Sequence, residues 1–374
     1  MKSVARKRIV DVEEEWGVIC SLLPEGWQEK ARELGAVRRL RGVGSVETLL
    51  RILLMHLVDG CSLKETSLRA AQEGWAQLSA VALLKRLRSA GPWLTWIAQE
   101  LRGHSVAPEA GRVCLAVDAT TVTEPGPTGS LWRVHWCVNL LDLRCEFFEV
   151  TDSHGGEKFA RFPIASDQLI MGDRGYSTPG GIDYVRKRGA HVLIRVNPMS
   201  LPLYKARGRV RPLNVLSALR PLKVGEIRAW TAWVKSPEGD WHKGRLVAVK
   251  RSLSATRREL RRQRRNSKAK NRKLGPRAKA LARYVLVWTS LPASELGRKK
   301  VMKYYRLRWQ LELVFKRVKS IMGLGQLPKY SDASSRAWLS GKLLVAMLVD
   351  RLWHKAEHFS PWGYALLDAA QPLA

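Results

Sequence analysis

The chain has 374 residues, of which 65 are lysine or arginine and 33 are aspartate or glutamate, so its formal net charge is +32. At roughly 100–200 residues per domain, this length predicts two or three domains. So large a positive excess destabilises a compact state unless a polyanion neutralises it. We therefore expect nucleic acid as the partner, with an anionic membrane surface as the weaker alternative.

Cysteine usage argues against a zinc-binding protein, and hydropathy argues against a secreted or membrane-spanning protein. The chain contains five scattered cysteines, at positions 20, 61, 114, 137 and 145. None of them lies in a CxxC pair or a Cys/His cluster with zinc-ligand spacing, a usage typical of a reducing cytosol. The start of the chain lacks the apolar segment of a signal peptide, and the most apolar later run, 343–353, is too short to span a bilayer. We expect a soluble cytoplasmic protein.

Residues 1–108 are predicted to be helical. Apolar residues recur at three- and four-residue spacing in 46–62 and in 79–103. Within the second segment, the pair Gly91-Pro92 predicts a break. The region is either a compact DNA-binding unit or a plain helical bundle, and the sequence alone leaves both open.

The hydrophobic period changes near residue 109. Segments 112–122 and 130–152 are rich in Val, Trp and Phe and predict three meandering strands. Two later strands flank a short helix at 180–189. Residues 109–198 therefore predict an α/β fold with a mixed sheet.

Residues 199–292 break this order and predict a β-rich insertion. Inside it, residues 257–283 hold thirteen lysines and arginines but one acid, Glu259. Blocks of like charge this dense are usually solvated or disordered in the free chain. The functional alternative is an arm that orders on DNA and grips phosphates. Its expected contacts begin with Arg257, Arg258, Arg261, Arg262, Arg264 and Arg265.

From residue 293 the pattern is helical again, with one long helix in 293–330 and a second helical region in 331–374. At about 100° per residue, Tyr305, Arg308, Glu312 and Lys319 fall on one stripe that borders the buried face. Taken alone, this stripe is explained by surface pairing of Arg308 with Glu312, which is worth a few tenths of a kcal/mol.

Two aspartates suggest more than surface pairing. Asp118 and Asp173 are each expected at the carboxyl end of an apolar strand, where α/β sheets open a crevice for ligands. A lone aspartate there is more often a turn or cap residue. Together with Glu312, in so basic a chain, they fit phosphodiester chemistry. Its carboxylates hold Mg²⁺ ions roughly 3.5–4 Å apart, and basic residues hold the phosphates in line.

These residues resemble a known family. The spacing Tyr305, two residues, Arg308, three residues, Glu312, six residues, Lys319 is similar to the Y-R-E-K signature of DDE transposases of bacterial insertion sequences, the insertion-sequence-four group. The stretches "LAVDATTV" and "IMGDRGYST" around Asp118 and Asp173 resemble that family as well. The resemblance covers roughly residues 45–350.

The resemblance implies an RNase H-like core, formed by 109–198 and 293–330 and interrupted by the β-rich insertion 199–292. It implies that Asp118, Asp173 and Glu312 bind two Mg²⁺ ions, for which Mn²⁺ would substitute. The implied reaction is hydrolysis at the transposon end, followed by attack of the new 3′-OH on target DNA. The implied partners are double-stranded DNA and a second copy of the chain in a homodimer, with no membrane. The implied location is the bacterial cytoplasm, with the nucleoid.

The resemblance also suggests accessory residues. Tyr305, Arg308 and Lys319 would contact phosphates, and Lys316 lies beside them. A tryptophan of the insertion would assist the strand ends, the candidates being Trp230, Trp233, Trp241 and Trp288. His154 and Glu157 lie in a Gly-rich loop, where a solvated position is favoured over an approach to the metals.

Two other functions remain open. One is a domesticated or decayed copy that binds DNA without cutting it. The other is an RNase H-type nuclease that cuts DNA but never joins 3′ ends.

Overall fold

The computed structural model describes residues 12–102, 111–123, 131–152, 154–269, 271, 273–320, 323, 327 and 331–357. The chain forms two compact units. The first comprises Met1–Gly103, Thr121–Trp132 and Lys316–Ala374, and the second comprises His104–Thr120 and Arg133–Phe315. Several strands and helices of the second unit carry the predicted site.

The described part of the first unit is mainly helical. Ser45, Ser62 and Ser79 each cap the start of a helix by accepting a hydrogen bond from a backbone N–H three residues on. Over the described residues, no helix has both the length and the apolar character needed to cross a membrane. The helices of this unit are α1 (Val12–Cys20), α2 (Trp27–Glu33), α3 (Val46–Val58), α4 (Leu63–Gln72), α5 (Ala80–Glu100) and α12 (Asp332–Glu357).

The break predicted at Gly91-Pro92 is wrong, because α5 runs through both residues. A Cβ on Gly91 would lie 3.3 Å from the Cα of Ala337 in α12, so glycine lets these two helices approach closely. Trp93 and Leu94, which follow the proline, are fully buried. Tertiary packing here outweighs the one helical hydrogen bond that proline removes.

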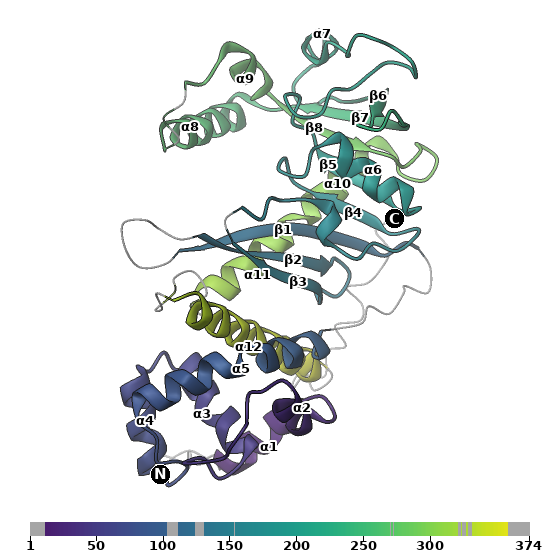
Figure 1. The fold of residues 1–374 in the computed structure, drawn as a ribbon. Coiled ribbons are helices and arrows are strands. Elements are labelled where there is room, and N and C mark those ends of the chain that lie inside the picture. The colour runs from purple at the N-terminus through teal and green to yellow at the C-terminus, as the bar shows by residue number, and fades with distance from the viewer. Residues whose placement is uncertain are drawn as a thin grey trace, which may run out of the picture. The chain divides into compact units, whose positions relative to one another are not determined.

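The described strands form one mixed sheet in the order β3-β2-β1-β4-β5-β8-β7-β6 (Figure 1). The β1–β4 and β4–β5 pairs are parallel, and β2–β3 is antiparallel. The predicted mixed α/β sheet is therefore confirmed. The strands are β1 (Cys114–Thr123), β2 (Leu131–Asn139), β3 (Cys145–Thr151), β4 (Leu169–Gly172), β5 (His191–Arg195), β6 (Ile227–Lys235), β7 (Trp241–Lys250) and β8 (Tyr284–Thr289).

Strands from residues 199–292 extend this same sheet. β8 pairs antiparallel with β5 on one side and with β7 on the other, and β7 pairs with β6. The helical elements between and after the strands are η1 (Phe159–Arg161), α6 (Pro179–Lys187), α7 (Val215–Leu219), α8 (Leu253–Ala269), α9 (Pro276–Leu281), α10 (Arg298–Leu307) and α11 (Trp309–Ser320).

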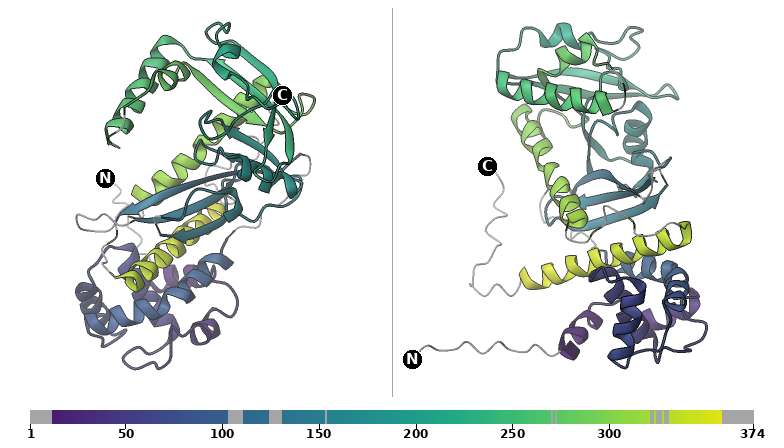
Figure 2. Two further views of the ribbon diagram at one scale, coloured as in Figure 1. Left: turned by 45° about the horizontal axis from the view of Figure 1, so that its top comes forward. Right: turned by 90° about the vertical axis from the view of Figure 1, so that its left-hand side faces the viewer.

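Helices cover both faces of the sheet in the second unit. Alternate strand residues point to opposite faces. Val117 and Ile170 pack in one core with Ile182 of α6, and Met171 packs in the other core with Val301 of α10. Figure 2 shows α10 and α6 on opposite sides of the strands. Along β1 and β4, alternate residues therefore face α6 on one side of the sheet and α10 on the other.

The basic block is helical in the free chain, so the expected disorder is wrong over residues 253–269, where α8 forms. Its six leading arginines are all exposed, whereas Glu259 is 8% exposed and Thr256 is also buried. The helix therefore has a solvated basic face and a narrow face that packs on the protein.

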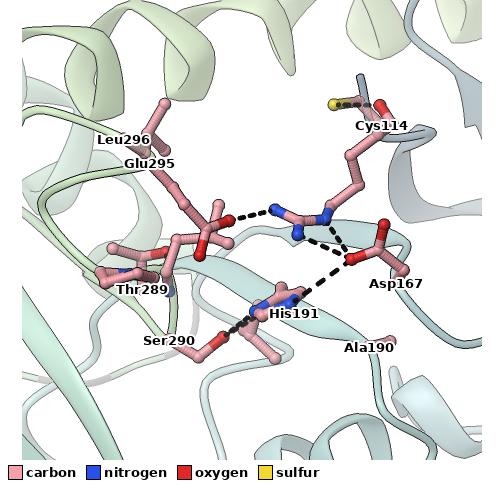
Figure 3. A network of polar contacts seen from close by, with 12 residues as sticks. Cys114, Asp167, Ala190, His191, Thr289, Ser290, Glu295 and Leu296 are labelled. Atoms are coloured by element: carbon pink, nitrogen blue, oxygen red, sulfur yellow. Dashed lines mark hydrogen bonds and ion pairs between the residues drawn. The ribbon is translucent and has the colours of Figure 1, made fainter. Parts of the chain in front are cut away.

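One polar network ties together the amino-terminal ends of the parallel strands (Figure 3). Arg112, just before β1, contacts Asp167 before β4 at 2.6 Å and Glu295 after β8 at 2.9 Å. His191, at the start of β5, lies 3.8 Å from the same Asp167 carboxylate. The hydrogen bond from Arg112 holds the pKa of Asp167 below its usual value. Further along the chain, Asp173 directly follows β4 and Asp118 lies within β1.

Candidate active site

Asp118 and Asp173 lie at matching positions on neighbouring strands. The parallel register pairs Cys114 with Leu169 and Ala116 with Met171. Two residues further along, the same register puts Asp118 beside Asp173. Asp173 directly follows β4, as predicted, but Asp118 lies inside β1, so the prediction that it ends its strand is wrong. β1 continues because β2 pairs with its other edge, whereas β4 stops at Gly172.

Both aspartates belong to the face that α10 covers. Val117 points into the core that contains α6, so alternation turns Asp118 to the other face. Met171 packs in the core that contains α10, and Asp173 has the same parity. The Asp118 carboxylate accepts a 2.8 Å hydrogen bond from the Ala119 N–H, and the Asp173 carboxylate accepts one of 2.6 Å from the Gly175 N–H.

Arg308 connects Glu312 to this pair. The single long helix predicted here is interrupted at Arg308, where α10 ends and α11 begins. Arg308 is 9% exposed, and its Nη2 donates to Glu312 Oε1 at 2.6 Å. Its Nη1 donates to Asp118 Oδ2 at 3.3 Å. The predicted pairing of Arg308 with Glu312 is present, but the same guanidinium also reaches a strand of the sheet.

Negative charge is crowded at this position. Burial, and then the charge of Asp173, raise the pKa of Asp118 to about 7, while the Ala119 N–H and Arg308 act in the opposite direction. A nearby cation would relieve this cost, because it favours the ionised carboxylates. Carboxylate oxygens are the ligands that Mg²⁺ prefers, so the donor set fits that ion.

The closest group of acids lies elsewhere. Among the described residues, Asp183, Glu238 and Asp240 have carboxylate oxygens within 4.8 Å of one another. Lys187 Nζ contacts all three, at 2.8 to 3.0 Å, so a lysine already neutralises this group. The three predicted carboxylates do not form so close a group, since the Arg308 guanidinium stands between Asp118 and Glu312.

The predicted phosphate contacts differ in accessibility. Tyr305 is partly buried against the core below α10, and its ring centroid lies 5.7 Å from Cζ of Arg308. Burial raises the pKa of the Tyr305 hydroxyl. Lys316 is exposed. The side chain of Lys319 lies outside the described residues.

The candidate tryptophans also differ in burial. Trp288 is fully buried, and its Nε1 donates to the Ala232 carbonyl oxygen at 3.0 Å, so it is held in the core. Trp230, Trp233 and Trp241 are partly exposed. Trp309, which no sequence motif singled out, directly follows Arg308 and is 56% exposed. An exposed ring beside the candidate carboxylates is available to stack on a base.

An arginine cluster beside the site was also missed. Glu259 of α8 lies 3.1 Å from Arg262, 3.7 Å from Arg174, 3.8 Å from Arg195 and 4.0 Å from Arg251. The buried Nε atoms of Arg174 and Arg195 have no hydrogen-bond partner among the described residues. One carboxylate thus faces four guanidinium groups. Arg174 directly follows Asp173, which was the signal available in the sequence.

The two candidate residues of the Gly-rich loop, His154 and Glu157, differ in exposure. His154 has a 93% exposed side chain, as expected of a solvated loop. Glu157 does not fit that expectation, because it is half-buried and its Oε2 lies against Gly175. It therefore comes close to Asp173.

Comparisons with known proteins match this chain over most of its length. A family model described as the Transposase DDE domain matches residues 109–348. The Escherichia coli transposase for insertion sequence element IS421 is 32% identical over 363 residues, covering 93% of this chain and 96% of that protein. InsL, for element IS186A of Escherichia coli K12, is 32% identical over 362 residues with the same coverage. A Bacillus thuringiensis transposase, for IS231F, is 26% identical over 196 residues, covering 48% of this chain and 40% of that protein.

Proposed function

The chain belongs to the DDE transposase family of insertion sequences, and from that premise we propose that it cuts the ends of its own element and joins their 3′-OH groups to target DNA. The proposal takes Asp118, Asp173 and Glu312 as the catalytic carboxylates. The observation that carries it is Arg308, which joins Asp118 on β1 to Glu312 on α11. The charge of Asp173 acts on the same Asp118 carboxylate.

We propose that the three carboxylates hold two Mg²⁺ ions, for which Mn²⁺ substitutes. When bound, such ions activate the attacking water or 3′-OH and stabilise the leaving oxygen. Arg308 neutralises Asp118 and Glu312 in the free protein. Its planar guanidinium can also hold a phosphate through two parallel hydrogen bonds, which places a DNA strand beside the carboxylates.

The basic surface would bind the DNA outside the cutting site. The exposed arginines of α8 (Arg257, Arg258, Arg261, Arg262, Arg264 and Arg265) supply phosphate contacts, together with Tyr305, Lys316 and Lys319. Joining two element ends requires two sites, so we propose a homodimer in the synaptic complex. With DNA as its partner and a charge of +32, the protein would work in the bacterial cytoplasm, with the nucleoid.

A single incubation tests the function. The protein is mixed with a duplex carrying its element's end and with a supercoiled plasmid, in Mg²⁺ or in EDTA. We expect Mg²⁺-dependent joining of 3′ ends that Asp118→Ala abolishes and Glu238→Gln, in the other acidic group, leaves intact. Tight binding without nicking in any divalent metal would indicate a DNA-binding remnant. Cutting without joining would indicate a nuclease.

A further inference from the structure

A fourth carboxylate lies beside the two aspartates. We propose that Glu157 supplies a carboxylate oxygen to the divalent cation held by Asp118 and Asp173, an inference that rests on the proposed function. The site would then be built from four acids, one of them in the loop that precedes β4.

The position of Glu157 is seen most directly at Gly175. A Cβ on Gly175 would overlap Glu157 Oε2, and the same point lies 3.1 Å from Asp173 Oδ1. Both carboxylates therefore converge on this one glycine. Gly175 also donates its N–H to Asp173 at 2.6 Å. A side chain at position 175 would displace the Glu157 carboxylate from its place beside Asp173.

The loop that carries Glu157 is held in place. Arg133 Nη1 donates to the Gly155 carbonyl oxygen at 2.9 Å, and Arg161 Nε donates to the Gly156 carbonyl oxygen at 2.8 Å. Phe159, two residues after Glu157, is fully buried and lies 5.1 Å from the Tyr176 ring. Because the backbone is held on both sides, only the side chain of Glu157 remains to be ordered toward Asp173.

The electrostatics of Tyr176 agree with this placement. Burial, followed by the charges of Asp118, Glu157 and Asp173, raises the pKa of the Tyr176 hydroxyl. The charges of Asp118, Glu157 and Asp173 therefore all act on this hydroxyl.

The Tyr176 hydroxyl is an independent sign of a ligand. Tyr176 is 1% exposed, and its hydroxyl has no hydrogen-bond partner among the described residues. A buried hydroxyl is normally satisfied. Lying in the field of three carboxylates, this oxygen is available to a hydrated cation. Mg²⁺ keeps several of its waters in protein sites, and those waters donate hydrogen bonds to such groups.

Metal binding without DNA tests the proposal separately from catalysis. The full chain is titrated with Mn²⁺, and free Mn²⁺ is followed by electron paramagnetic resonance. Glu157→Gln should weaken binding by at least about tenfold, since even residues that only support metal ligands cost 10–100-fold. Gly175→Ala, which displaces Glu157 but keeps its charge, should weaken it too. The matched control is Glu295→Gln, a carboxylate at the opposite end of the strands that pairs with Arg112 at 2.9 Å.

The outcomes distinguish this proposal from the function on which it rests. Wild-type Mn²⁺ affinity in Glu157→Gln, with a loss in Asp173→Asn, would overturn the role of Glu157 and leave the metal site standing. Unchanged affinity in Asp173→Asn would overturn both. An equal loss in Glu295→Gln would overturn the proposal, because general charge would then explain the effect. Circular dichroism of each variant verifies folding.

Discussion

Arg308, at the junction of α10 and α11, donates a hydrogen bond to Asp118 on β1, 190 residues earlier in the chain, at 3.3 Å. The same guanidinium holds Glu312 at 2.6 Å. The guanidinium therefore lies between two carboxylates, in a position that would also suit a metal cation. In the free protein, Arg308 supplies the positive charge that the proposed metal would supply in the active complex.

Arg308→Ala should make folding depend on metal. Removing a buried cation from two acids should lower the free energy of unfolding in EDTA by up to about 3 kcal/mol, the lower end for a buried pair, because Glu312 is half exposed. Mg²⁺ should restore more stability to this variant than to wild type, as urea unfolding would measure. The control is Arg112→Ala, at the other end of the strands, where Mg²⁺ should not restore the lost stability. Equal Mg²⁺ effects in all three proteins would contradict the prediction.

Glu312→Gln should separate DNA binding from cutting. Glutamine keeps an oxygen that accepts from Arg308, so the helix junction and the DNA affinity should stay close to wild type. Cleavage of an element end should be lost, because the amide no longer offers a charged ligand to Mg²⁺. A gel-shift assay and a strand-cleavage assay on one preparation measure both. Normal cleavage would remove Glu312 from the site.

Neutralising the exposed face of α8 should flatten the salt dependence of DNA binding. Each lost phosphate contact lowers the slope of log affinity against log salt by roughly 0.9. The substituted residues, each changed to Gln, are Arg257, Arg258, Arg261, Arg264, Arg265 and Lys268, all of them exposed. Arg262 is kept because it pairs with Glu259. An unchanged slope would show that the exposed face of α8 does not contact DNA phosphates.

Glu259→Gln should reduce stability in a pH-dependent way. Burial alone would raise the pKa of Glu259, but hydrogen bonds from Gln263 and Arg262 and the surrounding arginine charges lower it to about 2. A carboxylate with a depressed pKa stabilises the fold above its unfolded pKa, and this contribution is lost as pH falls toward the folded value. At pH 7 the variant should lose up to about 3 kcal/mol, the lower end of the cost of breaking a buried ion pair, because Arg262 and Arg174 are partly exposed.

The same comparison has a defined pH window. Between about pH 4.5 and pH 2, the difference in unfolding free energy between wild type and Glu259→Gln should shrink, because wild-type Glu259 is then protonated in the unfolded chain. Denaturant unfolding at pH 7, 5 and 3.5 measures it. Other carboxylates titrate in both proteins and cancel. A difference that stays constant down to pH 3.5 would show that the charge of Glu259 does not stabilise α8.

Local patterns in the sequence predicted much of the fold. Period-two runs predicted β1 to β5 between residues 109 and 198, and the helical spacing around Tyr305 placed Arg308 next to Glu312. These predictions succeeded because strand alternation and the helical turn depend on residues close together in the chain. The predicted break at Pro92 failed because α12, more than two hundred residues away, packs against that turn of α5.

The charge, the strands of residues 109–198 and the spacing of the three carboxylates within the motifs that resemble DDE transposases could all be read from the sequence. The packed fold was needed to show that Asp118 lies within its strand and that Arg308 reaches it. It also decided that Glu157 meets Asp173 at Gly175, and that Glu259 is buried among arginines. Each of these depends on contacts between residues far apart in the chain. No local period encodes such contacts, because they arise only when the sheet and its covering helices pack together.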